Sequence, residues 1–193
     1  TMPANTSVTV ADGTVSISAQ AFSKRTGLTS ITIPSSVTSI GYSAFAQTGL
    51  TSIIIPESVT SIGSNAFANT GLVSLVFNAD SCADFSDGTY SFYDYYPPFS
   101  RLTTLQTVTI GENVKNIPAW FISGCVNVTS LTIPESVTSI GSSAFANTGL
   151  TSITIPSSVT SIEDGVFSGC TSLTSITIPE SVTSIGYQAF YNC

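Results

Sequence analysis

The sequence predicts a mainly β repeat solenoid that forms a single domain over residues 1–193, and three observations carry that prediction. A first phrase, LTSITIP at residues 150–156, recurs along the chain with a period of 22 or 23 residues. A second phrase, V-T-S-I, follows it and leads to a phenylalanine, as at residues 159–167. Apolar residues come singly between Ser and Thr, which is typical of strands with one buried face. Units this short bury their apolar faces only by stacking, so the repeats share one core.

We count about eight units. They start at Asn5, Leu28, Leu50, Leu72, Leu105, Val128, Leu150 and Leu173. In a regular unit the first, fourth, sixth, tenth and thirteenth positions are apolar, and a phenylalanine follows them. In the second unit these residues are Leu28, Ile31, Ile33, Val37, Ile40 and Phe45.

Each unit divides into three elements. The opening L-x-x-I-x-I predicts a strand, because Val, Ile and Thr suit a half-buried pleated surface. Proline follows this strand in five units, as Pro156 does, and ends it because proline has no amide hydrogen. V-T-S-I predicts a second short strand on another side of the coil. Residues 43–46 (SAFA) predict a turn or a single helical turn with Phe45 pointing inward, after which Gly49 permits the bend.

The fourth unit contains an insertion. From the last core residue of the strand to the phenylalanine, the spacing is 12 residues in the second unit (Ile33 to Phe45) but 22 from Phe77 to Phe99. The segment 78–98 is aromatic and acidic, and insertions in solenoids often mark a binding face. The first unit, residues 1–27, departs from the pattern and is expected to be a cap.

These patterns resemble the BspA-like, or treponemal-type, leucine-rich repeat family. The resemblance rests on the L-x-x-I-x-I-P starts, the V-x-x-I segments, the Ala-Phe pairs such as Ala44-Phe45, and the Gly-Cys pairs such as Gly169-Cys170. It implies a right-handed leucine-rich-repeat coil with a parallel sheet on one face and short turns opposite. It also implies an extracellular or cell-surface location, a link to adhesion, and no shared catalytic residues.

Composition excludes several classes of function. The net charge is −7 with only four Lys and Arg, so nucleic acid is not an expected partner. No apolar run approaches the roughly 18 residues of a spanning helix, so we expect no membrane insertion. The chain has no histidine, which removes Ser-His and Cys-His pairs and histidine metal sites. We therefore expect neither an enzyme nor a cofactor.

Two sets of carboxylates can be distinguished, one directly after the strands and one in the insertion. Glu57, Glu112, Glu135 and Glu180 share the slot after the strand, and we interpret them as solvated charges in turns. Calcium binding by the insertion aspartates stays open, although their spacing is not that of an EF-hand loop. They are Asp80, Asp84, Asp87 and Asp94.

Three of the four cysteines, Cys125, Cys170 and Cys193, occupy one slot that holds Thr or Leu in other units. This favours buried packing positions and free thiols. A bridge between Cys170 and Cys193 in adjacent units stays open. Cys82, in the insertion, has no identifiable partner.

The candidate binding residues are exposed aromatics. Such side chains beside carboxylates suit protein hot spots or sugar stacking. The alternative is that they fold back to shield the flank of the solenoid. The candidates are Tyr90, Phe92, Tyr93, Tyr95, Tyr96 and Trp120. Asn5 and Asn127 match the glycosylation triplet and are possible acceptors.

Three functions are compared. The first is a surface module that binds a protein or glycan for adhesion. The second is a structural subunit that assembles head to tail into a filament, because the last coil has no polar unit behind it. The third, ice binding through Ser/Thr ladders, needs a regular array of outward hydroxyls that Ile54, Val76 and Phe77 interrupt.

Overall fold

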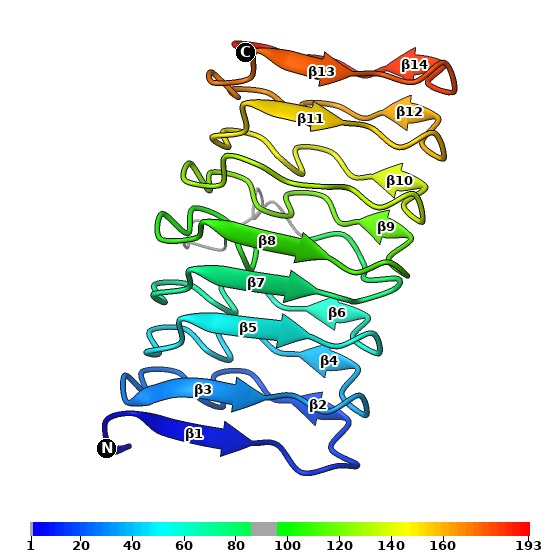
Figure 1. Ribbon diagram of the computed structural model, residues 1–193. Coiled ribbons are helices and arrows are strands. Elements are labelled where there is room, and N and C mark those ends of the chain that lie inside the picture. The colour runs from blue at the N-terminus through cyan, green and yellow to red at the C-terminus, as the bar shows by residue number, and fades with distance from the viewer. Residues whose placement is uncertain (1, 86–95) are drawn as a thin grey trace.

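The computed structural model describes residues 2–85 and 96–193, and it confirms the solenoid. The coils stack in chain order from the N-terminus to the C-terminus, with one long strand of each coil except the sixth on a common main face (Figure 1). These strands are β1 (Thr6–Thr9), β3 (Leu28–Thr32), β5 (Ser52–Ile55), β7 (Ser74–Phe77), β8 (Thr107–Ile110), β11 (Ser152–Thr154) and β13 (Ser175–Thr177). Every pairing between them is parallel, as in β5 with β7, where Ile53 lies opposite Leu75.

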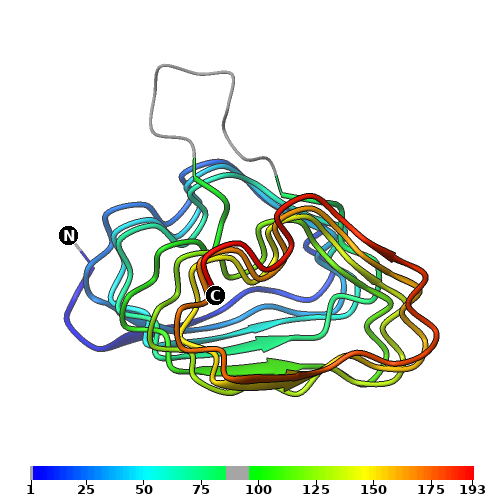
Figure 2. The same ribbon diagram turned by 90° about the horizontal axis from the view of Figure 1, so that it is seen from above.

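A second side of the coil carries the strands predicted from V-T-S-I, each only two residues long. They are β2 (Ser16–Ile17), β4 (Ser39–Ile40), β6 (Ser61–Ile62), β9 (Asn116–Ile117), β10 (Ser139–Ile140), β12 (Ser161–Ile162) and β14 (Ser184–Ile185). They also pair in parallel, for example Ile40 with Ile62. Seen from above, successive coils lie nearly over one another (Figure 2).

The main face differs from the prediction at two places, because β3 does not pair with β5 and the sixth unit forms no main-face strand. The strand expected after Val128 does not form, and in the described residues the sheet divides into β1-β3, β5-β7-β8 and β11-β13. The second side stays continuous here, because β9 of the fifth unit pairs with β10 of the sixth. The coils therefore remain stacked while their main-face ladder is interrupted.

The Ser-Ala-Phe-Ala segments are turns, and the described residues contain no helix. Ser43, which begins one such segment, and Gln47, which directly follows it, have φ of 51° and 58°, outside the helical range. The amide of Ala46 donates to the carbonyl of Ser43 at 3.1 Å, and the amide of Phe45 donates to Ala66 of the next coil at 2.8 Å. The backbone thus turns in place and bonds along the stack.

The phenylalanine column lies in the core, as predicted. Phe45 and Phe67 are fully buried and stack at 5.2 Å, and similar contacts join Phe22 to Phe45 and Phe67 to Phe99. The fifth unit has Ile122 in this column, so a second stack runs from Phe145 through Phe167 to Phe190.

The glycine that follows each turn has a role different from the predicted one. At Gly149 the φ is not positive, and a Cβ there would lie 2.1 Å from the carbonyl oxygen of Val126 in the preceding coil. Gly149 is required by close backbone approach and not by a bend. At Gly71, in the same slot, an added Cβ would lie 3.8 Å from its nearest atom, the Leu50 carbonyl oxygen, so close approach does not require glycine there.

Hydroxyl groups bond between coils. The Ser136 hydroxyl donates to the Val114 carbonyl at 2.8 Å, and that of Ser181 donates to Val159 at 2.9 Å. Thr183 bonds in the same way to Thr160 at 3.2 Å. These side chains satisfy carbonyls of the preceding coil, which explains the Ser and Thr content of the repeat better than solvation alone.

Candidate functional site

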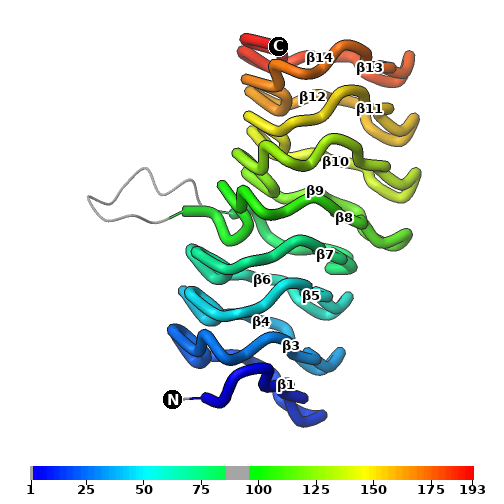
Figure 3. The backbone as a smooth tube through the Cα atoms, turned by 60° about the vertical axis from the view of Figure 1, so that its left-hand side comes forward, coloured from blue at the N-terminus to red at the C-terminus, as the bar shows by residue number. Residues whose placement is uncertain are grey.

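Most of the predicted aromatic site lies outside the described residues, namely Tyr90, Phe92, Tyr93 and Tyr95. Figure 3 shows the described chain resuming beside the stack after the segment drawn in grey. Tyr96 is the first described residue there and bonds to Asn65 of the third unit. Its carbonyl accepts from the amide of Asn65, and its amide donates to Asn65 Oδ1, both at 2.7 Å. The Arg101 guanidinium lies 4.6 Å from the centroid of the Tyr96 ring, a cation–π contact.

Trp120, the last predicted aromatic, lies in the turn of the fifth unit. It is partly buried, its φ is 60°, and its amide donates to Ser142 of the next coil at 2.9 Å. Its backbone therefore bonds along the stack like those of the other turns.

The described part of the acidic cluster consists of Asp80 and Asp84, while Asp87 and Asp94 lie outside the described residues. Asp84 Oδ1 accepts the amide hydrogen of Ala119 at 2.8 Å, a bond that ties the insertion to the fifth unit. Asp80 Oδ1 is buried without a hydrogen-bond partner. Within residues 2–85 and 96–193, no three His, Cys, Asp or Glu side chains gather as metal ligands do.

A cavity of about 440 Å³ lies beside Asp84, and Glu163 also lines it. The Glu163 carboxylate accepts the hydroxyl of Ser161 at 2.6 Å. Both carboxylates are thus engaged by the protein's own donors.

All four cysteines are free thiols, as expected for Cys125 and Cys170, which are fully buried. Cys193 is exposed, contrary to the prediction of a buried slot. Each of these three thiols donates to the phenylalanine carbonyl of the preceding coil, for example Cys125 to Phe99 at 3.1 Å. Burial raises the pKa of Cys125 from 9.0 to about 12. It does the same for Cys82, where nearby Asp84 adds to the effect.

The two predicted glycosylation residues are both exposed. Asn5 has a φ of 57°, directly before β1. Asn127 Nδ2 donates to the Thr103 carbonyl at 2.6 Å, so its amide is already bonded. Their glycosylation stays a prediction.

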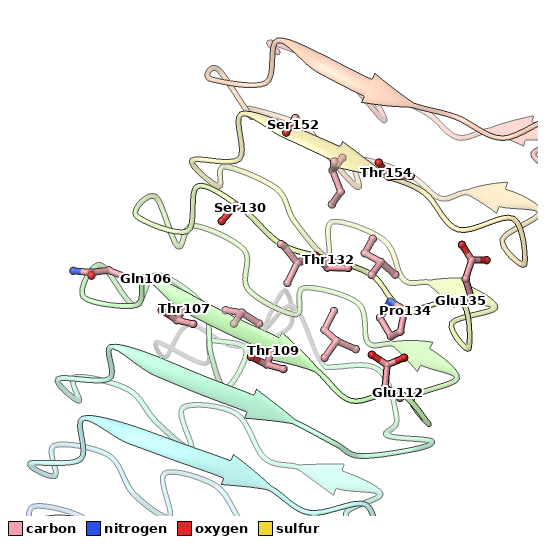
Figure 4. A pocket seen from close by; sticks show the side chains of 15 residues that line it. Gln106, Thr107, Thr109, Glu112, Ser130, Thr132, Pro134, Glu135, Ser152 and Thr154 are labelled. Atoms are coloured by element: carbon pink, nitrogen blue, oxygen red, sulfur yellow. The ribbon is translucent and has the colours of Figure 1, made fainter.

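A groove of about 760 Å³ opens on the main face where the sheet is interrupted, between β8 and β11 (Figure 4). Its floor is residues 130–133 of the sixth unit, which form no strand. Outward hydroxyls line it from three successive coils. They are Thr107, Thr109, Ser130, Thr132, Ser152 and Thr154.

Glu112 and Glu135 lie at the same end of this groove, just beyond the strand positions (Figure 4). Ser157 holds Glu135 in place, because its amide and hydroxyl donate to Glu135 Oε2 at 3.2 and 3.1 Å. No Lys or Arg is among the 15 residues lining the groove. The groove therefore combines uncharged donors and acceptors with negative charge at one end.

Sequence reasoning identified these two glutamates only as solvated turn charges and missed the groove. The sequence contained one indication of their relationship: Glu112 and Glu135 occupy the same position in two neighbouring units. Nothing in the sequence indicated that the main-face sheet is interrupted here, because residues 128–134 carry the same pattern as the units that form strands.

Among the described residues, none belongs to a helix of the length and apolarity required to span a bilayer.

Comparisons with known proteins agree with this architecture. The family model for BspA type leucine rich repeat regions, with six copies, matches residues 4–95 and 96–193. A leucine-rich repeat protein from Bacteroides ovatus is 29% identical over 97% of the chain, with a TM-score of 0.79. The chain spans 46% of the length of that protein. The leucine rich repeat protein of T. pallidum is 25% identical, with a TM-score of 0.61 over 97% of this chain and 76% of its own. No curated protein is significantly similar.

Proposed function

This chain belongs to the BspA-type leucine-rich repeat family, and from that membership we propose that it is a non-enzymatic extracellular scaffold that binds a protein or glycan at a cell surface. The observation that carries the proposal is the open main face, on which alternate side chains of the strands are exposed, as the burial pattern of β5 illustrates. A rigid stack of coils that presents loops and an exposed face is a suitable scaffold for binding.

The test is binding of the protein to immobilised matrix proteins and glycans. We expect saturable binding to at least one of them. In the variant with Tyr93→Ala and Tyr95→Ala, loss of that binding assigns it to the insertion, and retained binding places it elsewhere on the scaffold. Tyr187→Ala is the matched control, because Tyr187 is 74% exposed on the last coil, away from the insertion. A protein that binds nothing on the panel contradicts the proposal.

A second candidate function is head-to-tail assembly into a filament, in which the first coil of one copy would pack on the last coil of another. Ile185 is 55% exposed there, whereas its counterpart Ile162 in the preceding coil is buried. A neighbouring copy in a filament, or a further coil of a longer chain, would cover this surface. Sedimentation velocity at increasing concentration tests it. We expect association that Ile185→Ser weakens, and a monomer at every concentration contradicts it.

The ice-binding alternative gains no support from the main face. Ile54 is 59% exposed in the row of outward side chains, and the sheet is divided into three parts.

A further inference from the structure

We propose that the groove between β8 and β11 binds an extended peptide with basic side chains, which pairs with the unpaired edge of β8 and places a Lys or Arg at Glu112 and Glu135. This inference rests on the proposed function and narrows its ligand to a peptide segment of a protein. It names a site that lies on the main face and not in the insertion.

The backbone of β8 supplies the first argument. In a parallel sheet, the backbone amide and carbonyl of one residue point to the strand on one side, and those of the next residue point to the strand on the other side. The amides of Thr107 and Gly111 donate to Val73 and Phe77 of the fourth unit at 3.0 and 2.9 Å. The intervening Val108 and Ile110 therefore direct their backbone groups into the groove, and both residues line it.

The facing segment of the sixth unit is also unpaired. Within the described residues, no backbone hydrogen bond involves residues 130–133, whereas the flanking Thr129 carbonyl accepts from Thr151 at 3.1 Å. Edges with free amides and carbonyls accept an added strand. A peptide of roughly six residues covers the four residues of β8 and the groove end.

Charge supplies the second argument. Glu135 is held by Ser157, so its carboxylate lies at the groove end before any ligand arrives. Glu112 forms no hydrogen bond or ion pair in the described part of the chain and is available to a ligand. With two carboxylates and no cationic lining residue, the groove is complementary to a basic peptide and repels an acidic one.

The probe is a blocked peptide of roughly six residues that alternates Lys with Thr, which favours an extended chain. Binding is measured by calorimetry and by hydrogen exchange of the backbone amides. We expect saturable binding that weakens with salt, because the charges are exposed. In the free protein the amides of Val108 and Ile110 exchange fast while that of Thr107 is protected. Peptide addition protects Val108 and Ile110.

The variant Glu112→Gln with Glu135→Gln should weaken binding about three- to tenfold, in line with two exposed ion pairs. Its matched control is Glu57→Gln with Glu180→Gln, which removes the same charge from the same slot outside the groove and should change binding less than about twofold. A peptide methylated at alternate backbone nitrogens should lose most of its affinity, because it cannot pair with β8.

Three results overturn the inference: no saturable binding, equal binding of a Glu-Thr peptide, or equal loss in both glutamine variants. Saturable binding of a neutral oligosaccharide that protects the same amides also overturns it, in favour of a glycan. If the peptide fails while binding to the matrix panel persists, the groove inference falls and the proposed function stands.

Discussion

Phe121 meets Phe77 edge-on, with ring centroids 4.8 Å apart and ring planes inclined by 64°. Both side chains are fully buried. Phe121 occupies the slot that holds Ala44 and Ala144 in other units, and Ile122 follows it where those units have phenylalanine. The fifth unit thus carries its phenylalanine one position earlier than the other units and places an isoleucine in the phenylalanine slot.

Replacing Phe121 with alanine should lower the free energy of unfolding by about 3–5 kcal/mol, because a fully buried ring leaves a cavity. Urea unfolding followed by circular dichroism measures the change. Tyr187→Ala, on the exposed last coil, is the control and should change it by less than about 0.5 kcal/mol. A Phe121 variant as stable as that control would mean that the ring is not packed as described.

Gly149→Ala should destabilise the protein by roughly 1–3 kcal/mol, because the new methyl group would overlap the Val126 carbonyl. Gly71→Ala, in the same slot of another unit, should be neutral or stabilising by up to about 1 kcal/mol, since it has room and restricts the unfolded chain. Thermal unfolding of the two variants compares them directly. Equal effects would contradict close approach as the reason for glycine.

Stability should fall as pH rises above 9. Burial raises the pKa of Cys82 and Cys125 from 9.0 to about 12, so the folded state holds these protons more tightly than the unfolded state. The stability they contribute is complete below pH 9 and is lost between pH 9 and 12, by at most about 1.4 kcal/mol per pH unit per thiol. Urea unfolding at pH 7, 9 and 10.5 measures this slope. The Cys82→Ala, Cys125→Ala double variant should show a smaller slope, and an unchanged slope refutes the assignment.

Cys193 should react first with a thiol reagent in the native protein. It is exposed, whereas Cys82, Cys125 and Cys170 are buried. An aromatic disulfide reagent at pH 8 should modify one thiol rapidly and three only as the protein unfolds. Cys193→Ser should remove the rapid phase, and rapid reaction of a second thiol in that variant would contradict the burial of the others.

The periodic part of the fold was predictable because its signal is local to each unit. The spacing from Ile33 to Phe45 gave the core column, and V-T-S-I gave the second row of strands. The shift of the phenylalanine to position 121 was visible only as Ile122 in the phenylalanine slot, since its packing partner Phe77 is 44 residues away in the chain.

The groove was not predictable for a related reason. Whether residues 130–133 form a strand depends on alignment with the coils on both sides, which no unit encodes by itself. The insertion was located by one spacing, and its aromatic residues 90–95 lie outside the described structure, so their role in binding stays a prediction.

The interruption between the fifth and sixth units has a mechanical consequence. Their coils are joined by β9 with β10 and by bonds such as Trp120 to Ser142, but not along the main face. Tension along the axis of the stack would therefore separate the two coils first on the main face, while the β9-β10 side and the turns stay bonded. The junction between the second and third units, where β3 and β5 are also unpaired, would open in the same way, before the junctions that are paired on both sides, such as β1-β3 with β2-β4.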